Sequence, residues 1–421
     1  MVGADRRDVT SGGPAAARST AFALIAAVWL CLGVAPLVAQ ARVGGEIEAL
    51  NTLAWDGAEE ELGLLGYGAG TIDLRSDRDR NVQARLTLNA MLGSILDPLT
   101  DRPVSASVLS VPRASIRFRF PVTDTYTVRV TAGRDRVSWG SGRLFNAADV
   151  IFGADGTGAA DFLEISGDLR DETTWLTAVY FPLGDFAYFE PIVLPPLPGL
   201  ELAAAAGGAE SAEGVDDGEP DGALAAGTAV PGIERTRAGG RLSFEAGRFT
   251  FEPGYLYDGP TERHEAVLTI TGLIGVDVYG AGRISLDGDV DSDNAWERTT
   301  FSAGGYNHFR LGFDTTLDAR LEALVRPGGD WEDQSDPHAD YGLMLYPELI
   351  LTPSRTVSLV LRSVVSPIDR SALTSAGVNW NVFGGFNMVA FAGVQTGDDT
   401  AVFSRQRPGA ATLTTGFTYS F

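Results

Sequence analysis

Seven arginines carry the most suggestive chemistry in this sequence, because each falls on the polar side of a segment in which polar and apolar residues alternate. They are Arg85, Arg117, Arg119, Arg129, Arg241, Arg283 and Arg320. Guanidinium groups that line one wall of a water-filled passage would attract anions and order polar solutes. Carboxylates occupy the same polar positions elsewhere, so the arginines could instead pair across strands and hold the strand register. The pattern leaves both roles open.

The glycine-rich segment 139–149 is a second candidate, and it reads Trp-Gly-Ser-Gly-Arg-Leu-Phe-Asn-Ala-Ala-Asp. Its candidate residues are Trp139, Gly140, Gly142, Phe145, Asn146 and Asp149. The two glycines permit a tight turn, and the side chains of Asn146 and Asp149 can hydrogen-bond nearby backbone. Such a segment is either a structural corner that folds a loop against a wall or a constriction loop that narrows a pore.

Other residue types that could do chemistry are sparse. The histidines are His264, His308 and His338. They are far apart and have no catalytic spacing, so no enzyme is predicted. The aspartate-rich stretch Asp287–Asn294 could gather oxygens around calcium, but an EF-hand requires glycine at position six and glutamate at position twelve. Ser292 and Arg298 stand there, so we expect a solvated hairpin loop, no metal site and no cofactor.

The charge balance excludes one class of partner. The chain has 55 acidic and 32 basic residues, a formal net charge of -23, and no lysine. Binding to nucleic acid requires a basic surface, so no nucleic acid is expected. The single cysteine, Cys31, lies near the N-terminus, and a chain without a second thiol cannot form an internal disulfide.

The N-terminal region predicts export. Three arginines precede the apolar run 21–34, and Ala39-Gln40-Ala41 supplies small residues at a cleavage position. This order is typical of a secretory signal peptide, so we expect residues 1–41 to be removed. The run is too short for a spanning helix, and no later stretch approaches the length of about 18 apolar residues that one needs.

The C-terminal residues predict a strand with one apolar and one polar face. Phe417, Tyr419 and Phe421 alternate with small or polar residues. A strand between lipid and a wet interior shows this period of two. We interpret the three aromatics as a C-terminal signal for the barrel-assembly machinery of the outer membrane.

Segments with the same alternation recur along the chain and are separated by turn residues. We expect strands near 43–55, 62–74, 81–92, 113–121, 125–136, 161–169, 172–182, 236–246, 249–258, 262–273, 277–287, 297–306, 311–326, 340–351, 356–365, 373–382, 386–396 and 411–421. Long connections are expected at 93–112, 137–160, 183–235, 287–296, 327–339 and 397–411. The predicted fold class is all-β, a transmembrane antiparallel up-and-down β-barrel of about 18 strands (roughly 16–20). It forms one domain over residues 42–421.

The stretch 199–233 differs from the alternating segments. It is dominated by alanine, glycine, aspartate and glutamate, with its densest acidic part at 213–221. Such a composition buries too little apolar surface to order itself. We expect a mobile acidic loop, and a periplasmic linker between two domains is the alternative.

The residues before and within the glycine-rich segment follow a known pattern. Residues 133–137 read Gly-Arg-Asp-Arg-Val, and a W-G-x-G-x-x-F-N-x-x-D stretch comes after them. In these residues the chain resembles bacterial outer-membrane porins of the alginate-export type and their relatives. Many members carry proline where this chain has Ala147. The resemblance implies a barrel that resides in the outer membrane.

Together these features predict a passive porin in the outer membrane of a diderm bacterium, which passes small hydrophilic solutes or ions through a charged lumen. A structural or adhesive surface barrel with a plugged lumen is the alternative, and a secreted soluble β-protein is a third possibility. The expected partners are outer-membrane lipid, the barrel-assembly machinery and small polar solutes. An oligomer is compatible with the sequence, which specifies no subunit interface.

Overall fold

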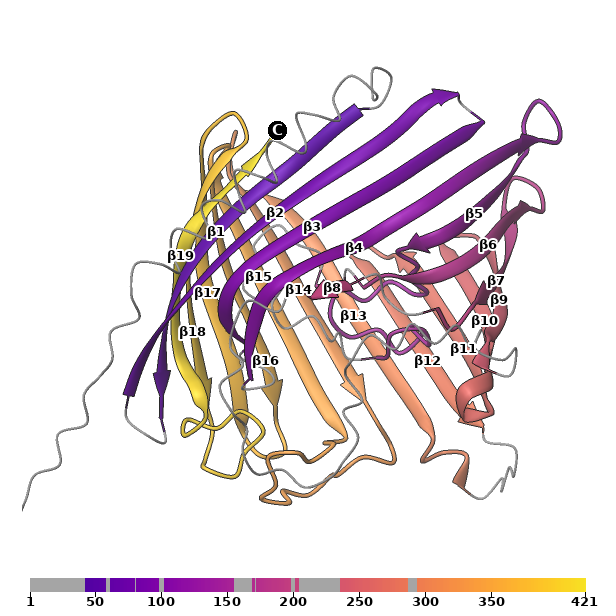
Figure 1. The fold of residues 1–421 in the computed structure, drawn as a ribbon. Coiled ribbons are helices and arrows are strands. Elements are labelled where there is room, and N and C mark those ends of the chain that lie inside the picture. The colour runs from indigo at the N-terminus through magenta and orange to yellow at the C-terminus, as the bar shows by residue number, and fades with distance from the viewer. Residues whose placement is uncertain are drawn as a thin grey trace, which may run out of the picture. The chain divides into compact units, whose positions relative to one another are not determined.

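The computed structural model describes residues 42–57, 61–79, 81–97, 102–154, 169–170, 172–197, 201–203, 235–286 and 294–421. The predicted signal peptide lies outside these residues, and so does most of the predicted acidic loop at 199–233. The described residues are almost entirely antiparallel strands and their connections (Figure 1). Among them, no helix is long and apolar enough to cross a bilayer.

The strands follow one another closely along the chain. They are β1 (Arg42–Asp56), β2 (Glu61–Asp79), β3 (Val82–Asp97), β4 (Arg102–Pro121), β5 (Thr127–Asp135), β6 (Thr174–Pro182), β7 (Ala187–Leu194), β8 (Glu201–Ala203), β9 (Arg237–Ala246), β10 (Phe249–Asp258), β11 (Arg263–Leu273), β12 (Asp277–Leu286), β13 (Thr299–Arg310), β14 (Thr316–Val325), β15 (Leu343–Ser354), β16 (Val357–Ser366), β17 (Ser371–Phe383), β18 (Phe386–Thr396) and β19 (Pro408–Ser420). A short 3-10 helix, η4 (Gly259–Thr261), joins β10 to β11.

The sheet closes on itself because its first strand pairs with its last. β1 pairs with both β2 and β19. β7 pairs directly with β9, whereas the three-residue β8 pairs with β4. Of the 19 strands in the sheet, β8 therefore stands beside the ring, and 18 strands form it. The prediction of an all-β antiparallel barrel of about 18 strands is confirmed.

Two sequence predictions about connections are wrong. The predicted loop at 93–112 is mostly strand, because β3 and β4 continue to a tight hairpin in which Asp97 pairs with Arg102. Alternation does persist through this segment, but small residues such as Ser105 and Ser107 replace the large apolar ones that made other strands recognisable. Backbone hydrogen bonds need no large side chains, so the ladder extends beyond the visible pattern.

The predicted loop at 183–235 contains a strand that the sequence pattern missed. The chain reverses at 183–186 and returns as β7, which pairs with β6 and β9. Pro191 lies within this strand, and proline usually argues against a strand interior. The predicted strand at 161–169 falls outside the described residues except for Leu169, and β5 pairs directly with β6.

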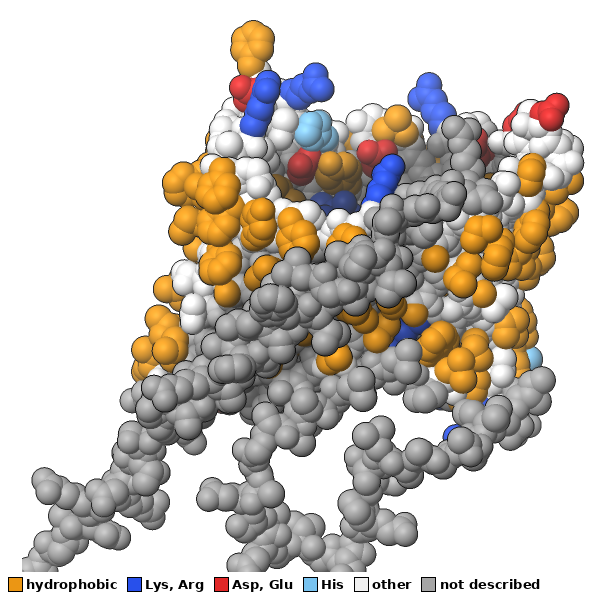
Figure 2. All heavy atoms as spheres, turned by 45° about the horizontal axis from the view of Figure 1, so that its top comes forward, with side chains coloured by type: hydrophobic (Ala, Val, Ile, Leu, Met, Phe, Trp, Pro, Cys, Tyr) orange, Lys and Arg blue, Asp and Glu red, His pale blue; other side chains and the backbone are white. Residues whose placement is uncertain are grey.

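The two faces of the barrel wall have opposite characters. Successive residues of a strand point to opposite faces, and one face carries exposed large apolar side chains such as Leu53, Phe118 and Leu321. Figure 2 shows hydrophobic side chains gathered on the described part of the outer surface. The other face points into the barrel, where for example Thr52 and Thr414 hydrogen-bond across the β1–β19 seam at 2.8 Å.

The long connections all lie at one end of the barrel, and the other end has only short ones. At the end where β19 finishes, the turns are as short as 247–248, 355–356 and 384–385. The long connections 136–173, 326–342 and 397–407 all belong to the other end. Outer-membrane β-barrels have short turns at one end and longer loops at the other, and this barrel shows the same asymmetry.

Candidate functional site

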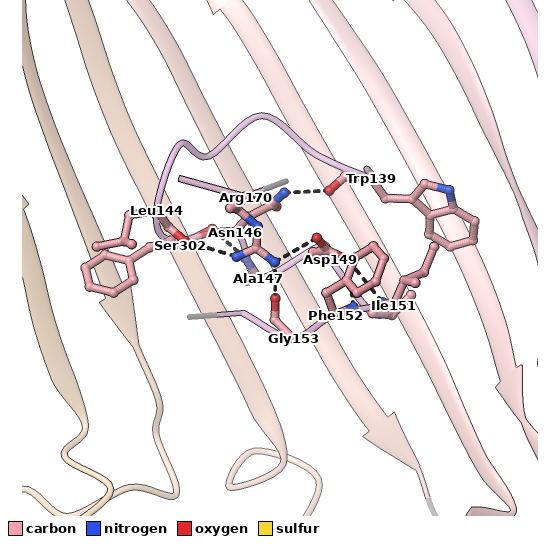
Figure 3. Close-up of polar contacts among 12 residues, drawn as sticks. Trp139, Leu144, Asn146, Ala147, Asp149, Ile151, Phe152, Gly153, Arg170 and Ser302 are labelled. Atoms are coloured by element: carbon pink, nitrogen blue, oxygen red, sulfur yellow. Dashed lines mark hydrogen bonds and ion pairs between the residues drawn. The ribbon is translucent and has the colours of Figure 1, made fainter. Parts of the chain in front are cut away.

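The segment 136–154, which follows β5, lies against the inner wall of the barrel (Figure 3). Trp139 is 1% exposed, and Asn146 and Asp149 are buried to the same degree. Its partners belong to lumen-facing positions on several strands between β9 and β15. We call residues 136–154 the inner loop.

Both glycines of the inner loop are required by its geometry. Gly140 has a φ of 84°, and a Cβ atom placed there would lie 2.2 Å from the Asn146 side chain. A Cβ atom on Gly142 would lie 1.9 Å from the Phe145 carbonyl oxygen. The turn also uses the Asn146 amide, which donates to the Trp139 carbonyl at 2.6 Å. The hydrogen bond expected from Asn146 to nearby backbone is therefore present.

Asp149 fixes the second half of the inner loop. One carboxylate oxygen accepts hydrogen bonds from the backbone N–H groups of Ile151 and Phe152. The other accepts from the Arg170 guanidinium at 2.7 Å. Burial raises the pKa of the Asp149 carboxyl above its ordinary value, and the Arg170 charge opposes that shift. Arg170 also donates to the Leu144 carbonyl at 3.0 Å, so one buried guanidinium ties two parts of the loop together.

Glu322 on β14 holds the first half of the inner loop. Its carboxylate accepts three consecutive backbone N–H groups, from Arg143 at 2.8 Å, Leu144 at 2.9 Å and Phe145 at 3.0 Å. The Glu322 side chain is fully buried, and Arg320 lies 3.2 Å from it. Charge-assisted hydrogen bonds to a buried carboxylate are stronger than neutral ones. Glu322 therefore attaches three consecutive residues of the loop to the wall.

Four further wall residues hydrogen-bond the inner loop, and one of them, Arg237 on β9, donates to the Ile151 carbonyl at 3.1 Å. The Ser302 hydroxyl on β13 accepts from Ala147 N–H at 2.9 Å. Tyr279 on β12 donates to the Phe145 carbonyl, and Arg241 on β9 donates to the Ser138 carbonyl, each at 3.1 Å. The loop is thus attached at separate points around the inner surface.

Apolar contacts complete the attachment. One cluster joins Trp139 and Ile151 of the inner loop to lumen-facing residues of the wall; its wall members include Leu176, Ile192, Leu256 and Val267. A second cluster joins Leu144 and Phe145 to Leu324, Val364 and Phe403. The wall has apolar side chains on its inner face where these loop residues pack. Burial of apolar surface between loop and wall favours the attachment of the loop.

The predicted arginines of β3, β4 and β5 lie side by side, as expected. Arg119 pairs in register with Arg129, and the Arg129 guanidinium stacks 3.9 Å from the Tyr180 ring centre. Arg117 donates to the Thr131 hydroxyl at 3.3 Å. Of this group only Arg85 has an acidic partner within the described part of the chain, and that partner is Asp73 at 3.1 Å. We call Arg85, Arg117, Arg119 and Arg129 the basic wall.

The remaining three predicted arginines are paired with carboxylates. Arg241 lies 2.7 Å from Glu190, and Arg283 lies 3.9 Å from Glu265. Arg320 contacts Glu322, as described above, and Glu348 at 3.8 Å. Two members of this set, Arg241 and Arg320, therefore belong to the attachment of the inner loop.

The predicted C-terminal aromatics stand on the outer face. Phe417, Tyr419 and Phe421 are all exposed, and the rings of Tyr419 and Phe421 stack at 6.1 Å. Their role as an assembly signal stays a prediction. The calcium candidate lies outside the described residues apart from Asn294, and within the described ones no group of acidic, histidine or cysteine side chains is placed to hold a metal.

Sequence reasoning missed Arg170, Ser302, Tyr279 and the use of Glu322 as an anchor. Glu322 is separated from its loop partners by 177 to 179 residues, so no local motif connects them. A signal was nevertheless present, because Leu256, Val267 and Leu324 place apolar side chains in the polar phase of their strands. Such departures from alternation mark where something covers the inner wall.

No family model matches this chain, and no curated protein matches it. Solved structures do match. A BenF-like porin from Pseudomonas fluorescens Pf-5 is 9% identical, over 90% of this chain and 98% of that one, with a TM-score of 0.52. OpdQ of Pseudomonas aeruginosa is 8% identical, over 90% of this chain and 98% of that one, with a TM-score of 0.50. At such low identity the likeness concerns the fold. In its fold the chain resembles bacterial outer-membrane porins, which are channels rather than enzymes.

Proposed function

We propose that this protein is an outer-membrane porin that lets small hydrophilic solutes or ions diffuse passively through a charged lumen. One observation carries the proposal: a closed ring of 18 strands holds a loop fastened across its inner wall. A barrel of this strand number encloses an aqueous channel. A loop attached inside it narrows the passage without needing a cofactor or a catalytic group.

The basic wall supports a preference for anions. Arg117, Arg119 and Arg129 have no carboxylate partner among the described residues, so their charges act on the lumen without a compensating charge beside them. A passage lined by one sign of charge concentrates the opposite ion. We therefore propose that anions pass more readily than cations.

The exterior supports placement in the outer membrane of a diderm bacterium. Large apolar side chains cover the outer face of the wall (Figure 2), as lipid contact requires. Aromatic residues gather where the strands end, with Phe383 stacked on Phe386 at 5.0 Å, which is typical of a membrane interface. The exposed C-terminal aromatics fit recognition by the barrel-assembly machinery.

A plugged structural or adhesive barrel is the second candidate, and the two buried clusters favour it. They place the inner loop, and also Phe403 from the β18–β19 connection, inside the barrel. Apolar groups packed this densely exclude water from the part of the interior that they occupy. The two candidates differ in whether the rest of the interior stays open.

Single-channel recording separates the two candidates. The protein, expressed from its full-length sequence and purified in detergent, is added to a planar bilayer under a salt gradient. A porin gives stable ohmic steps, and the basic wall predicts a reversal potential on the anion-selective side. Insertion without conductance would establish the plugged barrel, and cation selectivity would overturn the role proposed for the basic wall.

A further inference from the structure

A pocket of about 420 Å³ lies at the end of the barrel that carries the long connections. The long connections 326–342 and 397–407 and the short connection 367–370 build it. Its polar lining includes Asp333, Asp369, Arg370, Thr396, Asp398 and Arg405. A volume of this size is within the usual range for small-molecule sites, which is roughly 300–1,000 Å³.

The walls of the pocket are fixed by hydrogen bonds between connections. The Asp369 carboxylate accepts from the Ser371 hydroxyl at 2.9 Å and from Val402 N–H at 2.8 Å. Ser371 in turn accepts from Phe403 N–H at 3.3 Å, and Arg407 donates to the Pro337 carbonyl at 2.9 Å. The Asp369 carboxylate therefore has a structural role, and hydrogen bonds between the connections fix the shape of the pocket.

Other charged side chains of the pocket do not hold its walls together. The side chains of Arg370, Arg405 and Asp398 make no hydrogen bond or ion pair with any residue that the structure describes. Asp333 uses one oxygen to accept from Ser335 N–H and the Tyr341 hydroxyl. Two guanidinium groups and two carboxylates thus face one cavity without neutralising each other through direct contact.

The backbone at Arg370 supports a role for its side chain. Arg370 has a φ of 58°, in the left-handed region that glycine or asparagine adopts with less strain. Arg370 is the last residue of the short connection between β16 and β17. A glycine there would be sufficient for the turn itself. Strained residues that persist in a fold are concentrated at functional sites.

The β18–β19 connection contributes both to the pocket and to the packing of the inner loop. Phe403, in the β18–β19 connection, belongs to the same buried cluster as Leu144 and Phe145 of the inner loop. Arg405 follows Phe403 by two residues and lines the pocket.

We propose that this pocket binds small zwitterionic solutes, with their anionic group at Arg370 and Arg405 and their ammonium group at Asp398 and Asp333. A simple anion would leave the carboxylates facing it, and a simple cation would face two guanidinium groups. A solute with both charges satisfies both sets, because charge-assisted hydrogen bonds form on each side. The inference deepens the proposed porin function by naming a class of solute that gathers at the mouth.

Isothermal titration calorimetry on the purified full-length protein in detergent tests this directly. The probe is glutamine, which carries a carboxylate and an ammonium group. N-acetylglutamine keeps the carboxylate and removes the ammonium charge, whereas glutaminamide keeps the ammonium charge and removes the carboxylate. We expect saturable binding of glutamine, and binding about tenfold weaker or more for each blocked analogue, because each loses charge-assisted hydrogen bonds.

The variants are chosen so that the fold survives. Arg370→Asn removes the charge with a residue that tolerates the left-handed backbone, and Arg405→Gln and Asp398→Asn keep similar shapes. Each should weaken glutamine binding about tenfold. Arg310→Gln, an exposed arginine at the opposite end of the barrel, is the matched control and should leave binding unchanged.

The possible outcomes separate this proposal from the proposed function. No binding of glutamine, equal binding of the blocked analogues, or equal binding by the Arg370→Asn/Arg405→Gln double variant would overturn the pocket, even if the channel conducts. Glutamine binding that the pocket variants weaken would support the pocket, even if bilayer recordings show no channel. In a conducting protein, glutamine should also produce brief current interruptions that the double variant loses while its open-channel conductance is kept.

Discussion

The basic wall and the wall that carries the inner loop contain the same residue type in the same phase, yet the arginines differ in their surroundings. On β4 and β5, Arg117 has a hydroxyl and Arg129 an aromatic ring as neighbour, and Arg119 pairs in register with Arg129. On β9 to β14, Arg241, Arg283 and Arg320 each lie within ion-pair distance of a glutamate.

The difference shows that position in a strand does not determine what a lumen arginine does. A guanidinium beside a carboxylate forms a local dipole whose field falls off quickly, and its hydrogen bonds hold structure. A guanidinium without such a partner projects its charge into the passage, screened only by mobile ions. Of the two roles proposed from the sequence, ion pairing is observed on the wall that carries the inner loop, and the attraction of anions by the basic wall stays a proposal.

Loss of the Glu322 carboxylate is expected to have the largest effect, because it weakens the attachment of the inner loop to the wall. Glu322→Ala leaves three backbone N–H groups without their acceptor and leaves the Arg320 charge with Glu348 alone, which costs about 3–5 kcal/mol of loop attachment. Trypsin should then cut after Arg143 in the inner loop, and bilayer recordings should show larger, noisier steps.

Two variants control for this result. Glu322→Gln retains one acceptor oxygen and should show a smaller effect. Glu46→Ala removes a carboxylate on β1 that accepts a hydrogen bond from Ser420 and should leave the loop protected. Full protection of Arg143 in Glu322→Ala would show that the apolar clusters alone hold the loop.

The buried Asp149–Arg170 pair should have the next largest effect. Arg170→Met keeps a long side chain but leaves the Asp149 carboxyl without its cation, at a cost of about 3 kcal/mol. Adding Asp149→Asn to Arg170→Met should recover part of that loss, since the two changes remove one shared interaction. Thermal unfolding of the four proteins in the cycle measures the coupling, and strict additivity of the two changes would contradict it.

The charge of the basic wall should affect selectivity rather than stability. Arg117→Ala combined with Arg129→Ala removes two positive charges that have no acidic partner, so the ratio of anion to cation permeability should fall severalfold. The reversal potential under a salt gradient reports that ratio, and the thermal transition should stay close to that of the unchanged protein. A reversal potential that does not move would mean that these side chains lie away from the conducting path.

Removal of a matched pair on the other wall should have the smallest effect. Arg283→Gln with Glu265→Gln deletes both charges of one ion pair and leaves the net charge of the lumen as it was. We expect the reversal potential to stay constant and the stability to change little, because both charges of a partly buried pair are removed together. A shift as large as that of the basic-wall variant would remove the distinction between paired and unpaired arginines.

Local pattern predicted the wall of this barrel well, because each strand shows its two faces in its own residues. The alternation of Phe417, Tyr419 and Phe421 with polar neighbours matches the exposed and inward faces of β19. The sequence pattern does not predict strand β7, because Pro191 interrupts its alternation. It predicts too short a β3–β4 hairpin, because small residues weaken the alternation of β4. The predicted fold class is correct despite these errors, since closure of the ring depends on backbone pairing.

The candidate site was predictable only within its own segment. Gly140, Gly142 and Asn146 specify a turn that the sequence shows directly, and the structure contains it. The place where that turn attaches depends on Glu322 and Ser302, which come close only after the barrel has formed. Contacts between residues this distant in sequence leave no motif, so the partner wall could not be identified beforehand.

The pairing of β1 with β19 also determines when the barrel can close during folding. Glu46 and Ser420, which meet there, are separated by 374 residues, so the first strand to be synthesised must wait for the last before its ladder is complete. Until then both strands present open edges to any other extended chain. Long-range pairing of this kind is slow to form. The nascent chain is therefore most vulnerable to aggregation throughout its synthesis and transport, and that vulnerability ends only when its final strand is in place.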